Sequence, residues 1–205
     1  RRGTDIARVI MDLPVLTCPK FLSLLNEFYA QRPDPPPIEA VLVAPEQIPQ
    51  PQRRLLVHDR DMTSTLEEHH GEPLALRVLE RRVDDDIYAR HIVLHTAQTQ
   101  RPAEYGALRV HLPLLDEPVR TALFQARQPL GAILNAHGGA YRGCPGAFFR
   151  IFSNDLINDS LQLGRSQWLY GRCNCLADRA GRTIAEVIEI LPPEDESQRS
   201  DWSSC

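Results

Sequence analysis

The sequence predicts an α+β protein with an antiparallel sheet of about six strands and helices packed on one side. Alternation of side chains, as in YARHIVLH at 88–95, is typical of strands that bury at least one face. The acidic link DDD at 84–86 joins two such stretches and is predicted to form a hairpin turn. Apolar residues at helical spacing mark separate segments, which favours helices grouped against the sheet.

Two helices and a connector are predicted before the first long strand. The stretch 19–30, PKFLSLLNEFYA, has apolar residues at helical spacing behind a proline suited to a first turn. Residues 32–52 contain seven prolines and are predicted to be an irregular surface connector. A second helix is expected over about 62–70, with Asp61 as its N-cap and Gly71 at its C-terminal end.

The remainder of the chain supplies the sheet. We expect strands over 73–83, 87–96 and 104–114, then helix, break and helix over 116–134, with Asp116 as a cap, and a closing hairpin of 166–177 and 183–191. The glycine-rich start of 136–165 gives no clear periodicity, and that segment is a candidate lid. Residues 1–193 are therefore read as one domain, and 194–205 as a polar tail.

Composition excludes several function classes. With 205 residues and 42% hydrophobic content, the chain can bury one core. A net charge of -4 without a basic stripe argues against a nucleic-acid partner. No apolar run reaches the roughly 20 residues of a membrane span, so we expect a soluble, cytoplasmic protein. Five cysteines, an odd number, do not indicate a disulfide framework.

The arginine in YARHIVLH is the first candidate functional residue. Tyr88, Arg90, Ile92 and Leu94 share one face of the predicted strand, so the guanidinium lies on the more apolar side. It must then reach water or meet an anion. Arg109 and Glu189 are further charged residues within predicted strands. Glu189 shares its face with Val187 and Leu191, whereas Glu186 lies on the opposite face.

Metal and cofactor motifs are not found. His69 and His70 are adjacent on a predicted helix and diverge, and His91 and His95 lie two pleats apart. The CxC of residues 173–175 has no second cysteine pair. The sequence has no G-x-S-x-G elbow, no P-loop and no G-x-G-x-x-G. We therefore expect no metal and no organic cofactor.

Four stretches, in order, resemble the chorismate lyase family. They are DRDMTSTLEEHHG at 59–71, YARHIVL at 88–94, QPLGAIL at 128–134, and LYGRCNCL followed by GRTIAEVIEILPP, at 169–176 and 181–193. Each stretch is unspecific alone, but their common order is informative. The resemblance implies a six-stranded antiparallel sheet with helices packed on it and an enclosed ligand cavity.

The resemblance also implies site residues and an activity. The family's ligand-binding arginine falls on Arg90, its carboxylate on Glu189, its Pro-Leu-Gly leucine on Leu130 and its flap methionine on Met62. A second strand arginine matches Arg109 less closely. These residues imply a lyase that converts chorismate into 4-hydroxybenzoate and pyruvate without a cofactor, with Arg90 and Glu189 as the catalytic residues. An arginine fork suits a small carboxylate substrate, and a free backbone N–H at the Leu130 helix start suits an anion.

Two other readings stay open. The chain departs from the family at His91, where an acidic residue is usual, and in the loop HTAQTQRPAEYG and the segment 136–165. A divergent enzyme acting on another small cyclic carboxylated metabolite is one alternative. The other is a non-catalytic effector-binding module, like that of GntR-type regulators, which shares this fold. The number of subunits is not predicted.

Overall fold

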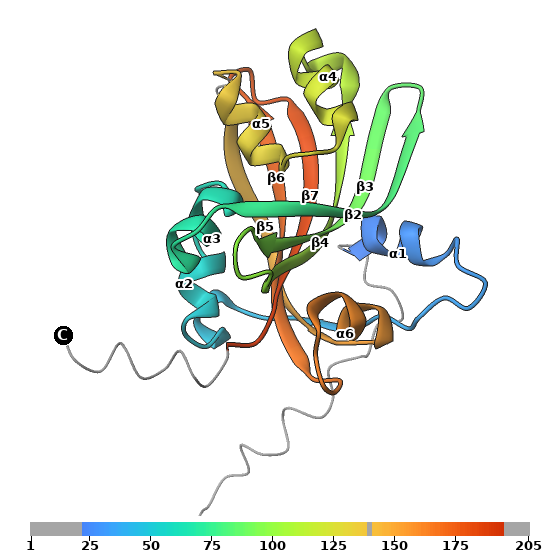
Figure 1. The fold of residues 1–205 in the computed structure, drawn as a ribbon, viewed down its shortest axis with the longest axis vertical. Helices are drawn as coiled ribbons and strands as arrows, with labels where there is room; N and C mark the ends of the chain where they lie inside the picture. Colours follow the sequence, from blue (N-terminus) through green and yellow to red (C-terminus); the bar gives the residue numbers. More distant parts are fainter. Residues whose placement is uncertain (1–21, 139–140, 195–205) are drawn as a thin grey trace, which may run out of the picture.

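In the computed structural model of the protein, the residues described are 22–138 and 141–194. These residues form one seven-stranded antiparallel sheet in the order β1-β5-β6-β7-β4-β3-β2 (Figure 1). The strands are β1 (Glu39–Leu42), β2 (Leu74–Asp84), β3 (Ile87–Thr96), β4 (Pro102–His111), β5 (Tyr141–Phe152), β6 (Trp168–Asp178) and β7 (Thr183–Leu191). The helices are α1 (Ser23–Tyr29), α2 (Gln52–Leu56), α3 (Met62–His70), α4 (Glu117–Gln125), α5 (Leu130–Ala136) and α6 (Asp155–Leu161).

The predicted α+β class is confirmed, and several elements form where local signals place them. Helix α3 begins at Met62 because the Asp61 side chain accepts a hydrogen bond from the backbone N–H of Ser64 at 2.8 Å. It ends at Gly71, whose φ of 69° is the left-handed conformation that glycine adopts at little cost. The β2–β3 hairpin turns at 85–86, within the acidic link.

The structure differs from the prediction in two segments. The proline-rich connector 32–52 contains β1, which is an edge strand and pairs only with β5. The segment 136–165 is no lid over its described part, because it forms β5 and α6. Its Pro145 and Gly146 fit within β5 because the pairing with β6 shifts register there, as in a β-bulge. Residues 139–140 of that segment, 19–21 of the first helix and 195–205 of the tail lie outside the described residues.

Helices cover both faces of the sheet rather than one. Helices α1 and α6 pack against the face that carries Ala89, Val93 and Tyr105. On the opposite face, α2 and α3 pack near Ile92 and Leu94, and α4 and α5 pack against Leu108 and Val110. Strand β3 is therefore buried along most of its length on both sides. Figure 1 shows α4 and α5 at one end of the sheet and α6 at the other.

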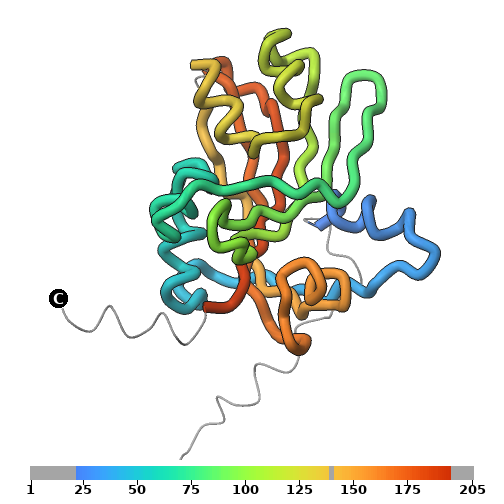
Figure 2. Tube along the Cα trace, viewed as in Figure 1, coloured from blue at the N-terminus to red at the C-terminus, as the bar shows by residue number. Residues whose placement is uncertain are grey.

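The sheet is bent as well as twisted. Strand β2 changes direction partway along its length (Figure 2), and its pairing with β3 shifts register between Val78 and Glu80. An extra residue in one strand of a pair produces this kind of bend. The first turn of α3 lies over the sheet face that holds Arg90.

Candidate functional site

A narrow cavity lies between the sheet and the first turns of α3 and α5. Its volume is about 50 Å³. The strands line it with Arg90, Ile92, Leu94, Glu104, Leu108, Tyr141, Asn174, Leu176, Val187 and Glu189, and the helix starts line it with Asp61, Met62, Thr63, Pro129, Leu130 and Gly131. Four of the five residues predicted from the sequence are thus brought together at this cavity.

Arg90 is the central cation of the cavity. Its side chain is fully buried, and its Nη2 donates to the carbonyl oxygen of Gln128 at 3.1 Å. Its Nε and Nη1 have no hydrogen-bond partner among the described residues. Burial lowers the pKa of this guanidinium, but a guanidinium keeps its charge in proteins. A buried cation needs hydrogen-bond acceptors for its N–H groups, and two of the Arg90 nitrogens have none among the described residues.

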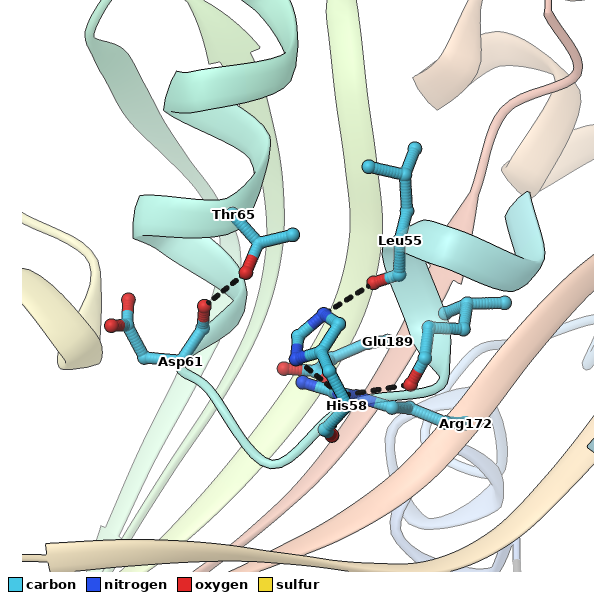
Figure 3. A network of polar contacts seen from close by, with 7 residues as sticks. Leu55, His58, Asp61, Thr65, Arg172 and Glu189 are labelled. Atoms are coloured by element: carbon cyan, nitrogen blue, oxygen red, sulfur yellow. Dashed lines mark hydrogen bonds and ion pairs between the residues drawn. The ribbon is translucent and has the colours of Figure 1, made fainter. Parts of the chain in front are cut away.

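Glu189 has a partner that the sequence analysis did not identify. Its carboxylate accepts a hydrogen bond from Nε of Arg172, its direct cross-strand neighbour on β6. Arg172 is fully buried, and its Nη1 donates to the carbonyl oxygens of Leu56 at 2.9 Å and His58 at 3.0 Å (Figure 3). Burial and the Arg172 charge together lower the pKa of His58. The network fixes Glu189 as one half of a buried ion pair.

Glu104 is a further carboxyl group of the cavity, in addition to Asp61 and Glu189, and it was also missed. It lies on β4, only 3% exposed, and its Oε2 has no hydrogen-bond partner among the described residues. Burial raises the pKa of this carboxyl well above its usual range, and the nearby Glu189 carboxylate raises it further, while Arg172 opposes the shift. Burial and the Glu189 charge therefore both favour the neutral form of Glu104.

The roof of the cavity is held close to the sheet. Asp61 caps α3, and its carbonyl oxygen accepts from the Thr65 hydroxyl at 2.8 Å (Figure 3). A side chain at Gly131 would place its Cβ 3.1 Å from both Asp61 Oδ1 and Thr63 Oγ1. Glycine at this position lets the starts of α3 and α5 approach each other, with Met62 and Leu130 facing the cavity. The close approach explains why the cavity is narrow.

Arg109, the fifth predicted site residue, lies elsewhere. It pairs in register with Ala89 and Glu186, so it occupies the sheet face opposite to Arg90. Its Nη1 donates to Glu186 at 3.0 Å, and its Nη2 forms an ion pair with Glu27 of α1. The structure does not bring Arg109 to the cavity, since strand alternation turns it away.

A larger hollow beside α2 and α3 is lined by polar side chains that are more exposed than Arg90 and Glu104. Its volume is about 240 Å³, and it is lined partly by His69, His70 and Arg101. None of those three side chains is fully buried, and water can solvate their polar groups. Within the described residues, no group of three or more histidine, cysteine or acidic side chains could hold a metal ion. None of the described helices is long and apolar enough to cross a membrane.

Solved structures similar to the chain include regulator proteins. The crystal structure of PhnF from Mycobacterium smegmatis matches with a TM-score of 0.51 and 10% identity, over 66% of this chain and 65% of PhnF. The effector domain of PhnF matches with a TM-score of 0.51 and 11% identity, over 64% of this chain and 87% of that domain. The ligand-binding domain of a proposed GntR-family transcriptional regulator from Bordetella bronchiseptica matches with a TM-score of 0.46 and 12% identity, over 58% of this chain and 86% of that domain.

The two PhnF matches establish the fold. The match spans slightly less than two thirds of the length of PhnF. No protein-family model matches the sequence, and no curated protein matches it. The chain shares the antiparallel α+β fold of the PhnF effector domain, and the chorismate-lyase-like fold predicted from the sequence is confirmed.

Proposed function

We propose that the chain binds a small carboxylate-bearing molecule in the cavity and acts as an effector-binding module. The observation that carries this proposal is the buried guanidinium of Arg90, whose Nε and Nη1 make no hydrogen bond of acceptable geometry with a described residue, although the Tyr88 hydroxyl is close enough to raise the arginine pKa. A carboxylate oxygen accepts a strong charge-assisted hydrogen bond from a guanidinium N–H, and Arg90 has such groups without a partner on two edges, at Nε and at Nη1. The similarity to the effector domain of PhnF supports a binding role for this fold.

Ligand entry requires the roof to move. A volume of about 50 Å³ holds little more than one water molecule, whereas small-molecule sites are usually about 300 Å³ or larger. The sheet side of the cavity is rigid, because its strands pair on both sides. The starts of α3 and α5 therefore separate when a ligand binds. Such a displacement couples ligand binding in the cavity to the positions of α3 and α5 on the outer surface. An effector-binding module needs a coupling of this kind to pass on the binding signal.

The proposal predicts that Arg90→Gln weakens binding of a monocarboxylate such as 4-hydroxybenzoate by about 30- to 150-fold. Removing one partner of a buried charge pair costs about 2–3 kcal/mol, which corresponds to that change in Kd. Isothermal titration calorimetry measures it. Arg109→Gln is the matched control, because Arg109 is an ion-paired arginine on the other face and should leave Kd unchanged. Equal affinities of wild type and Arg90→Gln would contradict the proposal.

A second candidate function is lyase activity on chorismate. The observation that favours it is that the four positions carried over from the chorismate lyase resemblance, Met62, Arg90, Leu130 and Glu189, line one cavity. Elimination of pyruvate makes the ring aromatic, so the protein mainly needs to hold the reactive conformer and exclude water. Arg90 would hold a substrate carboxylate, and the carboxyl groups at the far end of the cavity would contact the ring hydroxyl.

The lyase candidate predicts that the protein forms 4-hydroxybenzoate and pyruvate in equal amounts from chorismate. Chromatography detects the aromatic product, and a coupled dehydrogenase assay detects pyruvate. The Arg90→Gln variant should lose this turnover, while Arg109→Gln should keep it. Binding of 4-hydroxybenzoate without any turnover of chorismate would exclude the lyase and leave the effector-binding module.

A further inference from the structure

Three carboxyl groups line the cavity, and Glu104 is the one with a buried oxygen, Oε2, that has no hydrogen-bond partner among the described residues. Asp61 caps α3 through a hydrogen bond from the backbone N–H of Ser64. Glu189 is held by Arg172 in a buried ion pair. The resemblance to chorismate lyase had assigned the functional carboxyl to Glu189. The contacts favour Glu104 instead.

We propose that Glu104, rather than Glu189, is the carboxyl group that contacts the ligand, and that it does so as a neutral hydrogen-bond donor. The site then selects molecules with one anionic end for Arg90 and one uncharged oxygen, such as a hydroxyl, for Glu104. This inference rests on the proposed binding function and adds the specificity-determining residue.

Strand register places the two residues at opposite ends of the cavity. Arg90 lies opposite Leu108, whereas Glu104 lies opposite Leu94, four residues further along β3. At about 3.3 Å per residue, their Cα atoms are separated by about 13 Å along the strands. Both side chains line the same cavity, so one ring-sized molecule that enters when the roof moves can contact both.

The charges around Glu104 explain why it is neutral. No described basic side chain forms an ion pair with it, and the neighbouring cation Arg172 is already bonded to Glu189. A second ionised carboxylate beside Glu189 would be buried without a counter-ion, at a cost of several kcal/mol. Protonation removes that cost and supplies an O–H group. The same proton gives Glu104 a donor to offer to a ligand oxygen.

A ligand ammonium group is the competing partner for a buried carboxyl. It would require Glu104 to ionise and would place two ion pairs, one at each end, in a cavity lined by buried side chains. Each buried ion carries a desolvation penalty that its partner must offset. One anion at Arg90 and one neutral hydrogen bond at Glu104 leave the cavity without excess charge at a smaller cost. The observed contacts therefore favour the neutral oxygen.

Three matched monocarboxylates test this inference on the full 205-residue chain: 4-hydroxybenzoate, benzoate and 4-(aminomethyl)benzoate. We expect wild type to bind 4-hydroxybenzoate about tenfold or more tightly than benzoate, because benzoate leaves Glu104 unpaired. Glu104→Gln, which keeps a neutral donor, should bind 4-hydroxybenzoate within about threefold of wild type, whereas Glu104→Ala should lose about tenfold or more. Both variants should bind benzoate no more weakly than wild type does. Thermal unfolding shows whether each variant is folded.

Infrared spectroscopy tests the protonation state without any ligand. At pH 7 the wild type should show the carbonyl band of a protonated carboxylic acid, and Glu104→Gln should lack it. Absence of that band in wild type overturns the inference even if a variant fails to fold.

The outcomes separate this inference from the binding function. Arg90-dependent binding with no preference for the hydroxyl, or with Glu104→Ala unchanged, overturns the role of Glu104 and leaves the binding function standing. Tightest binding of 4-(aminomethyl)benzoate, lost in Glu104→Gln, assigns Glu104 to a cation and also overturns the inference. If the folded wild type binds none of the three compounds, the binding function itself fails, and the inference fails with it.

Discussion

Replacing Arg172 with methionine is expected to destabilise the protein by about 3–5 kcal/mol, the usual cost of removing one partner from a buried ion pair. The substitution leaves the Glu189 carboxylate, 5% exposed, without its cation. It also removes the donor that serves the carbonyl oxygens of Leu56 and His58. Urea unfolding monitored by circular dichroism measures the free energy of unfolding.

Arg109→Met is the matched control for this prediction. Arg109 is also an arginine in strand ion pairs, but its side chain is 24% exposed, so the loss is expected to be at most about 1 kcal/mol. The double variant Arg172→Met with Glu189→Met should be more stable than Arg172→Met alone, because it removes the orphaned charge. If the free energy of unfolding of Arg172→Met is within about 1 kcal/mol of the wild-type value, Glu189 must form another ion pair or become protonated in the variant.

The Arg172–Glu189 pair shows why local sequence patterns predicted only part of the site. The closing hairpin was predicted, but the pairing across it depends on one irregularity. Continuing the pairing of Ala177 with Thr183 in uniform register would place Arg172 opposite Ile188. The register shift between Leu176 and Ala177 places it opposite Glu189 instead. A shift of one residue changes which side chains are cross-strand neighbours, and the residue types in the two strands do not predict this shift.

Glu104 was missed for a different reason. In the sequence it opens the predicted strand 104–114, and a glutamate at a strand end is usually solvated. The structure begins β4 at Pro102 and covers this end with neighbouring elements, so Glu104 becomes a buried residue. By contrast, Arg90 was predicted because the residues that alternate with it, Tyr88, Ile92 and Leu94, already define an apolar face. Local sequence patterns cannot predict that a residue is buried when elements distant in the sequence cover it.

His91, on the other face of β3, was the residue that the sequence explained least. It is fully buried, and both ring nitrogens lack a hydrogen-bond partner among the described residues. The ring stacks on Phe28 with 5.5 Å between centroids and meets the edge of Tyr105 at 4.8 Å. The imidazole is therefore a packing element in an aromatic cluster. Burial lowers its pKa from 6.5 to about 3, with smaller contributions from Arg32 and Arg82.

His91→Phe is accordingly expected to remove a large part of the acid sensitivity of the fold. Because the pKa of His91 is lower in the folded than in the unfolded chain, the unfolded chain binds the extra proton between pH 6.5 and about 3, and stability falls as pH falls through that window. The contribution approaches about 1.4 kcal/mol per pH unit, or about 3 kcal/mol between pH 6.5 and pH 4.

Urea unfolding at a series of pH values compares the variants, and the difference between them isolates His91 from the other histidines. His91→Phe should match or exceed wild-type stability at pH 7, since it removes two unpartnered buried nitrogens, and should exceed it increasingly toward pH 4. Tyr105→Phe alters the same cluster but retains the imidazole, so it should keep the wild-type slope. Parallel curves for wild type and His91→Phe would mean that the imidazole gains a proton inside the folded cluster, and the aromatic packing would then have to accommodate a cation.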